Sequence, residues 1–380
     1  MRVAIDYRPA LRERSGVGEY THQLVKAMLA AFPPQRSATE LQLSIFSSSW
    51  KDRLAPSAEL AGARAIDRRI PVRLLNFAWH RWEWPPVEWL AGDRFDVTHS
   101  SHPLLMPSTL AAQVVTIHDL NFLSHPERTD AEIRRDYPAL AREHANRADR
   151  VIVSSAFARG EVERRLGVPA ERIAVCPAGA PGWVARRQAP KPGYVLFFGT
   201  LEPRKNIGGL LDAYERLIEK SGTPKGVELL LAGRATDSAQ PWLERIARPP
   251  LQGRVRHVGY VDSQERQALY EGARLLVQPS FEEGFGLPVL EGMSLGVPVV
   301  AANRGSLPEL VGDAGPLVDP ERPDEIAAAI ERLLADDGYA AACGAKGVAR
   351  ARDFSWDRTA HLVIEVYRQA IDARAQRRRH

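Results

Sequence analysis

Residues 280 to 300 read Ser280-Phe-Glu-Glu-Gly-Phe-Gly-Leu-Pro-Val-Leu-Glu-Gly-Met-Ser-Leu-Gly-Val-Pro-Val-Val300. The apolar run Leu275–Val277 precedes this stretch and predicts a strand. Pro288 suits the first position of a helix, because its ring presets a helical φ and it has no N–H to leave unpaired. The stretch therefore predicts a strand, a glycine-rich loop and a helix.

The loop of this unit is suited to an anion. Its backbone N–H groups would point out of a helix N-terminus, where the helix dipole and the unpaired donors favour a diphosphate. Glu283 precedes the loop and Glu291 is expected in the first helical turn, where carboxylates can bind sugar hydroxyls. A plainer interpretation leaves the glycines to form the turn and Glu291 to offset the helix dipole. The expected loop donors belong to Gly284, Phe285, Gly286 and Leu287.

The whole string resembles the signature of retaining glycosyltransferases of family 4. Two glutamates flank Gly-Phe-Gly-Leu-Pro, and Glu-Gly-Met-Ser-Leu-Gly-Val-Pro-Val-Val follows. The resemblance implies the GT-B fold and an enzyme that moves a sugar from a nucleotide-diphosphate donor to an acceptor hydroxyl with retained anomeric configuration.

Length and composition agree with an α/β protein of two domains. The chain has 380 residues, of which 44% are hydrophobic and 26% charged. It contains no apolar run near the roughly 18 to 20 residues that span a bilayer, and Met1 leads directly into a strand pattern rather than a signal peptide. Cys176 and Cys343 are too few for a disulfide framework. These features predict a cytoplasmic protein.

The charge balance is mildly basic, with 51 Lys and Arg against 47 Asp and Glu. The closing arginines could form a solvated tail or contact anionic lipid headgroups, and peripheral membrane contact stays an alternative. Nucleic acid is disfavoured, because no zinc-finger spacing, RNA-binding aromatic motif or heptad zipper is present.

Alternating strand and helix patterns in both halves predict two Rossmann-like, doubly wound parallel sheets with ligands at the carboxyl ends of their strands. Proline and glycine between residues 177 and 193 mark the domain boundary. We expect an acceptor-side domain over 1–183 and a nucleotide-sugar domain over 184–353. Residues 354–380 are expected to form a helix that crosses back to the first domain, followed by a basic tail.

Two first-half motifs match the family. Gly16-Val17-Gly18 follows the first strand pattern and resembles the family's N-terminal glycine loop, which approaches the donor phosphates, although an ordinary glycine turn would look the same. His118 ends the strand pattern of residues 113–117, where it can donate a hydrogen bond to a sugar hydroxyl without full charge. A structural histidine is the alternative, but Thr116-Ile-His-Asp-Leu120 matches the family's His-Asp position.

Two motifs in the second half of the chain also match the family. Gly199-Thr-Leu-Glu-Pro-Arg-Lys-Asn206 resembles the family's basic clamp, in which Arg204 and Lys205 would grip the diphosphate. Many relatives carry arginine where Thr200 stands, so whether Arg204 replaces it is open. Tyr260 and Val261 match the segment whose backbone reads the nucleotide base, although a plain turn after a strand would look identical.

Residues 74–90 have the most unusual composition in the chain. Tryptophan and arginine gather there and suit a membrane interface or a sugar-stacking surface, and packing into the domain core is an equal alternative. The tryptophans are Trp79, Trp82, Trp84 and Trp89.

The motif style resembles that of bacterial mannosyltransferases that build surface polysaccharide such as lipopolysaccharide. It implies GDP-mannose as donor and a saccharide acceptor, possibly linked to polyprenyl diphosphate. UDP-sugars, another GT-B enzyme and a non-catalytic sugar-nucleotide sensor remain alternatives. No Asp-x-Asp occurs, so we expect no metal, no other cofactor and a catalytic set of His118, Glu283, Arg204 and Lys205.

Overall fold

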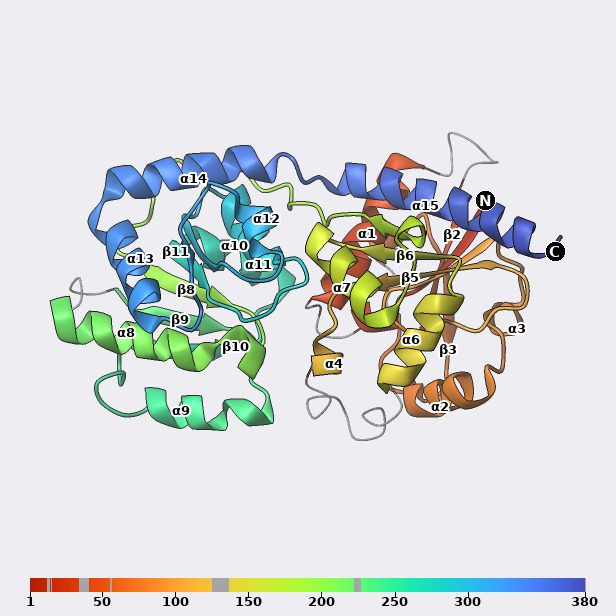
Figure 1. Ribbon diagram of the computed structural model, residues 1–380, viewed down its shortest axis with the longest axis horizontal. Helices are drawn as coiled ribbons and strands as arrows, with labels where there is room; N and C mark the ends of the chain where they lie inside the picture. Colours follow the sequence, from red (N-terminus) through yellow and green to blue (C-terminus); the bar gives the residue numbers. More distant parts are fainter. Residues whose placement is uncertain are drawn as a thin grey trace. The chain divides into compact units, whose positions relative to one another are not determined.

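The computed structural model describes residues 1–11, 14, 16–33, 41–54, 57–124, 137–221 and 227–379. The chain divides into two compact units, each built on its own parallel sheet (Figure 1). Unit 1 comprises Met1–Gly179 with Trp356–His380, and unit 2 comprises Ala180–Ser355. The prediction of two Rossmann-like sheets is confirmed.

The sheet of unit 1 has the strand order β3-β2-β1-β4-β5-β6-β7. Strand β1 pairs with both β2 and β4, so the chain reverses its direction of winding at β1. The strands are β1 (Arg2–Asp6), β2 (Gln42–Ser48), β3 (Arg64–Arg68), β4 (Val97–Ser100), β5 (Ala112–Ile117), β6 (Arg150–Val153) and β7 (Ile173–Val175).

Helices α2, α3, α6 and α7 cover one face of this sheet, and α1 and α15 cover the other. Helices α2 and α3 pack on β1, β2 and β3, and α6 and α7 pack on β5 and β6. The described helices are α1 (Val17–Ala31), α2 (Val72–Trp82), α3 (Val87–Ala91), α4 (Asn121–Ser124), α6 (Tyr137–Arg147), α7 (Ala156–Leu166) and α15 (Trp356–Arg377).

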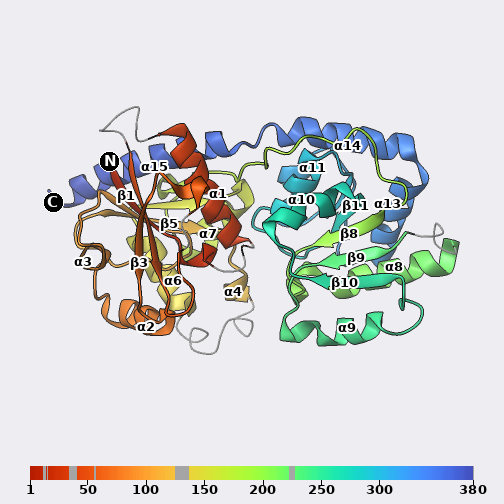
Figure 2. The same ribbon diagram turned by 180° about the vertical axis from the view of Figure 1, so that it is seen from behind.

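The final helix, α15, belongs to unit 1 although the chain reaches it only after completing unit 2. It packs on α1 and on strands β5 and β6, and it runs beside α1 in both views (Figure 2). Its buried face includes Val363, Ile364 and Tyr367. The predicted return of the C-terminal helix to the first domain is therefore confirmed.

The sheet of unit 2 has the order β10-β9-β8-β11-β12-β13. Successive residues of its central strand enter opposite cores, because side chains alternate across a strand: Val195 packs with one helix layer and Leu196 with the other. The strands are β8 (Tyr194–Phe198), β9 (Leu229–Ala232), β10 (Val255–Gly259), β11 (Ala273–Gln278), β12 (Val299–Ala302) and β13 (Leu317–Val318).

One face of this sheet carries α8 and α13, and the other carries α10, α11 and α12. No described helix of either unit is both long and apolar enough to cross a membrane. The helices of unit 2 are α8 (Ile207–Ser221), α9 (Gln240–Ile246), α10 (Ser263–Glu271), α11 (Leu287–Ser294), α12 (Leu307–Val311), α13 (Pro323–Ala335) and α14 (Asp337–Ala351).

Candidate active site

Three loops meet around Glu283 at the carboxyl edge of the unit 2 sheet. They follow β8, β11 and β12, which are neighbours in the sheet. The backbone N–H of Phe281 donates to the carbonyl of Arg204 (2.8 Å), and the N–H and hydroxyl of Ser306 both donate to the carbonyl of Glu283 (3.1 and 2.9 Å). The loops that the sequence connected only through a resemblance are thus joined by hydrogen bonds.

The carboxylate of Glu283 is buried and surrounded by donors. Lys205 Nζ lies 2.5 Å from Oε1, which also accepts from Ser280 Oγ at 2.8 Å and from Gln278 Nε2 at 3.0 Å. Arg204 Nη1 lies 3.5 Å from the other carboxylate oxygen. Burial alone would raise the pKa of Glu283, but the charges of Lys205 and Arg204 and the hydrogen bonds lower it to about 2.

This environment defines what Glu283 can do. Burial and the neighbouring charge of Arg204 lower the pKa of Lys205, and Glu283 opposes that shift. Since the pKa of Glu283 is about 2, the carboxylate is ionised at neutral pH and has no proton to give. It is an oriented hydrogen-bond acceptor rather than a general acid.

The loop ends one residue earlier than predicted. Gly286 adopts a φ of 102°, and a Cβ there would lie 2.7 Å from Leu307 Cδ2, so only glycine fits. Helix α11 therefore begins at Leu287, with Pro288 as its second residue. The first turn holds no acidic residue, which corrects the expectation that Glu291 lies there: Glu291 stands one turn further along.

Glu291 is held by an arginine that the sequence analysis did not single out. Arg266 Nε donates to Glu291 Oε2 at 3.0 Å, and Arg266 Nη2 lies 2.7 Å from Oε1. The guanidinium lies 4.9 Å from the centre of the Phe198 ring. One signal was present: Arg266 lies one helical turn before Tyr270, which is fully buried, so it occupies the apolar face of α10.

The turn after β10 leads into that helix. Tyr260 is more than one third exposed, whereas Val261 packs on the core of unit 2. The next residue, Asp262, caps α10 by accepting from the N–H groups of Gln264 and Glu265. The predicted base-reading turn is thus joined through α10 to the Arg266–Glu291 pair.

In unit 1, His118 stands at the carboxyl end of β5 with its ring edge-on to Tyr20, 4.6 Å between centres. Burial lowers its pKa to about 4, so the ring is neutral at pH 7. It hydrogen-bonds the backbone of Ser101, and Nε2 has no partner among the described residues. Nε2 is therefore the ring nitrogen that can bind a ligand, as donor or as acceptor according to the tautomer.

The two N-terminal glycines are required by the chain itself. Gly16 precedes α1 with a φ of 50°, and a Cβ on Gly18 would lie 2.5 Å from the carbonyl oxygen of Pro9. The backbone conformation therefore accounts for Gly16, and close packing accounts for Gly18. Gly16, Gly18 and His118 belong to unit 1, and every other predicted site residue belongs to unit 2.

The tryptophan-rich stretch divides between core and surface. Trp79 is buried against Phe46, and its indole N–H donates to the carbonyl of Pro85 at 2.9 Å. Trp82, Trp84 and Trp89 are each more than half exposed. Core packing therefore explains only the first of the four.

Solved structures place this architecture in a known fold class. Sucrose-phosphate synthase from Thermosynechococcus elongatus superposes with a TM-score of 0.77, covering 98% of this chain and 100% of its own at 22% identity. Anabaena HepE, solved with UDP and glucose, gives a TM-score of 0.65 at 19% identity and covers 96% of this chain and 98% of its own. At such identities the likeness defines the fold, which is GT-B.

Sequence relatives identify the family. The model for "Glycosyl transferase 4-like domain" matches residues 15–179, and that for "Glycosyl transferases group 1" matches residues 192–336. O-antigen chain mannosyltransferase B of Escherichia coli is 33% identical over 97% of this chain and 100% of its own length. D-inositol 3-phosphate glycosyltransferase of Rhodococcus jostii is 29% identical over 77% of this chain and 65% of its own. The chain therefore belongs to the group 1 glycosyltransferases of family 4, the retaining hexosyltransferases.

Proposed function

We propose that this enzyme transfers mannose from GDP-mannose, with retention, to a saccharide acceptor carried on polyprenyl diphosphate at the cytoplasmic side of a bacterial membrane. Near full-length similarity to an O-antigen mannosyltransferase supports the sugar and the pathway class. The observation that carries the proposal is the cluster of buried Glu283 and Lys205 with partly buried Arg204, because it joins fixed positive charge to an ionised acceptor of hydroxyl groups.

The positive charges are assigned to the leaving group. Lys205, Arg204 and the amides of the loop before α11 oppose the negative charge that grows on the departing diphosphate. Removing one such preorganised donor typically costs about 10²- to 10³-fold in rate. The guanidinium of Arg204 reaches the carbonyl of Glu282 and the carboxylate of Glu283, which supports Arg204 in the role of the arginine absent at Thr200.

We assign the hydrogen-bonding side chains of the site to hydroxyl groups of the donor. Glu283 would bind hydroxyls of the transferred sugar, and Glu291, oriented by Arg266, would bind the ribose. His118 Nε2 would hydrogen-bond a hydroxyl of the transferred sugar near its reacting carbon. Tyr260 and Val261 would lie beside the base.

Glu283 is a poor nucleophile because its pKa is about 2 and three donors hold the same oxygen. We therefore propose front-face attack. The acceptor oxygen bonds to the anomeric carbon while the bond from that carbon to the phosphate oxygen breaks, and the leaving phosphate takes the hydroxyl proton. This scheme requires no metal and no covalent intermediate.

The test is slow donor hydrolysis in EDTA, with GDP-mannose, UDP-glucose, UDP-galactose, UDP-N-acetylglucosamine and dTDP-rhamnose offered separately. We expect release of GDP from GDP-mannose, its loss in Glu283→Ala, and its retention in the control Glu244→Ala, an exposed residue of unit 2.

Each other outcome contradicts part of the proposal. Hydrolysis of a UDP-sugar instead would contradict GDP-mannose as the donor but would agree with the role proposed for Arg204 and Lys205. Hydrolysis only with added metal would refute the assigned role of Arg204 and Lys205. A donor that binds but is not cleaved, even with saccharide acceptors added, would favour a non-catalytic sensor.

A further inference from the structure

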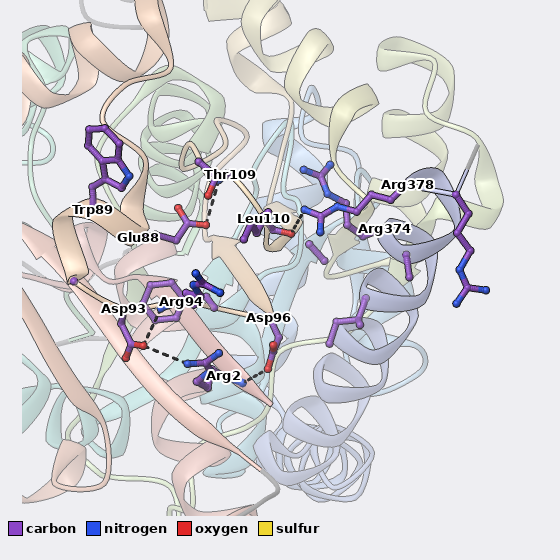
Figure 3. A pocket seen from close by; sticks show the side chains of 16 residues that line it. Arg2, Glu88, Trp89, Asp93, Arg94, Asp96, Thr109, Leu110, Arg374 and Arg378 are labelled. Atoms are coloured by element: carbon purple, nitrogen blue, oxygen red, sulfur yellow. Dashed lines mark hydrogen bonds and ion pairs between the residues drawn. The ribbon is translucent and has the colours of Figure 1, made fainter.

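A pocket of about 860 Å³ lies at the amino edge of the unit 1 sheet (Figure 3). Arg2 begins β1, Ala112 begins β5 and Asp96 precedes β4, and the last turns of α15 complete its wall. His118 stands at the carboxyl end of β5, which is the opposite edge of the same sheet. The pocket is therefore separate from the candidate active site.

The carboxylates of this pocket already bind donors. Asp93 pairs with Arg2 Nη1 at 3.3 Å, and Asp96 accepts from the backbone N–H of Arg2 at 2.7 Å. Glu88 Oε1 accepts from the hydroxyl of Ser108 and the N–H of Thr109, whereas its buried Oε2 has no hydrogen-bond partner among the described residues. Figure 3 shows Arg2 lying between Asp93 and Asp96.

The remaining cations of the pocket have no such counterpart. Among the described residues, no ion pair joins Arg94, Arg374, Arg378 or Arg379 to a carboxylate. Arg378 Nη2 donates to the carbonyl of Leu110 at 2.9 Å. The Nε of Arg374 is buried, and within the described part of the chain it meets no hydrogen-bond partner. The pocket therefore presents an excess of guanidinium groups to solvent.

Large apolar side chains line the same pocket and the hollow next to it. Trp89 lines the pocket and is 68% exposed, and Leu110 on the same wall is 48% exposed. Trp84 is 54% exposed and meets Trp89 edge-to-face at 6.1 Å between ring centres. A smaller hollow of about 240 Å³ continues the surface between the two tryptophans.

We propose that this surface docks the enzyme on a bilayer of anionic phospholipid. It consists of Arg94, Arg374, Arg378, Arg379, Trp84, Trp89 and Leu110, and we call it the arginine–tryptophan surface. The arginines bind lipid phosphates, and the indoles enter the headgroup layer, where their amphipathic rings are most stable. A soluble phosphate would explain the arginines but not the exposed tryptophans. A neutral saccharide would explain the tryptophans but not the arginines.

The test is co-sedimentation of the full-length protein with phosphatidylcholine vesicles, with or without about one third phosphatidylglycerol, at low salt. Wild type is expected to bind the anionic vesicles and to be released by high salt. Replacing Arg374, Arg378 and Arg379 together by Gln should weaken binding about 100-fold, since each arginine contributes about fivefold near an anionic surface. The same three positions changed to Lys should retain binding within a few-fold.

The tryptophans are tested with the double variant Trp84→Ser with Trp89→Ser, which should weaken vesicle binding about tenfold. Its matched control is Trp50→Ser, because Trp50 is exposed to the same 68% in the same unit and lies outside the pocket. The arginine control is Arg248→Gln, Arg322→Gln and Arg352→Gln, three exposed residues of unit 2. All variants should keep the wild-type melting temperature.

Three results would overturn the proposal: no binding of wild type to anionic vesicles, equal binding by the triple Gln variant, or binding of inorganic pyrophosphate in calorimetry without binding of vesicles. Lipid-free donor hydrolysis, measured on the same samples, reports the transferase proposal separately. A variant that loses vesicle binding and keeps hydrolysis would support docking alone.

Discussion

Arg266 and Glu291 form a buried ion pair that stabilises the fold only when both side chains are present. Each side chain is only 6% exposed, so both charges are almost completely desolvated. The two hydrogen bonds between them and the contact of Arg266 with the Phe198 ring offset the free-energy cost of that desolvation. Removing one partner of such a pair typically costs about 3 to 5 kcal/mol, because a buried charge is left alone. Arg256 and Glu228 make a similar contact at the protein surface, where an ion pair contributes about 1 kcal/mol or less to stability.

We predict that Arg266→Met lowers the free energy of unfolding by about 3 kcal/mol in urea titration. It should also raise the donor KM, because Glu291 loses its orientation. The double variant Arg266→Met with Glu291→Leu should recover most of the stability and none of the donor affinity.

Arg256→Met is the exposed control and should change the unfolding free energy by about 1 kcal/mol at most. If Arg266→Met and Arg256→Met prove equally mild, the pair does not stabilise unit 2 as argued.

At the scale of elements, a single histidine connects three segments of unit 1. His99 in β4 lies 2.7 Å from the hydroxyl of Tyr367 on α15 and 2.7 Å from that of Thr116 on β5. Burial lowers the pKa of His99 to about 3, so a neutral ring accepts one hydrogen bond and donates the other. This polar contact fixes where α15 lies on the sheet.

Tyr367→Phe should therefore lower the unfolding free energy by about 1 to 2 kcal/mol, because one buried ring nitrogen of His99 loses its partner. Urea unfolding followed by tryptophan fluorescence measures this. Tyr214→Phe is the reference, because the hydroxyl of Tyr214 donates to the carbonyl of Val227 in unit 2. Its loss of unfolding free energy measures the contribution of one tyrosine hydrogen bond. An unchanged midpoint for Tyr367→Phe would mean that apolar packing alone holds α15.

At the scale of the whole molecule, the chain order and the folding units do not coincide. Unit 2 is the continuous segment Ala180–Ser355, whereas unit 1 needs both the first 179 residues and the last helix. We predict that a fragment of residues 180–355 unfolds cooperatively in urea on its own. Residues 1–179 should require residues 356–380, supplied as a peptide, because α15 covers part of their core. Cooperative unfolding of 1–179 alone would contradict this.

Acid should weaken unit 1 before unit 2. Burial lowers the pKa of five histidines of unit 1 below the ordinary 6.5: His22, His80, His99, His118 and His144. Between their folded pKa values, which are about 3 to 4 where the shift is large, and 6.5 the unfolded chain binds more protons, so stability falls as the pH falls. Unit 2 contains one histidine, His257.

We therefore predict a lower urea midpoint at pH 5 than at pH 7 for the full chain, followed by fluorescence, since 6 of the 8 tryptophans lie in unit 1. The fragment 180–355 should keep its midpoint over the same range, because the low pKa of Glu283 acts only below pH 4.5. An equal shift in the fragment would place the acid-sensitive groups elsewhere.

Local pattern was sufficient for most of the architecture. The alternation of strands and helices, the glycine-rich loop before α11 and the proline near its start are signals between residues a few positions apart. The sequence by itself therefore determined two parallel sheets and the approximate positions of their loops. A family resemblance grouped Arg204, Lys205 and Glu283 in one site, and the strand order that makes β8 and β11 neighbours came from the structure.

Only the tertiary structure decided how those residues pair and which are buried. The ion pairs of Glu283 with Lys205 and of Glu291 with Arg266 join positions 78 and 25 residues apart. Trp79 is buried and Trp89 is exposed in one stretch of similar composition. Burial and ion pairing depend on neighbours that the sheet and the crossing helices bring together, and a linear pattern does not contain those neighbours.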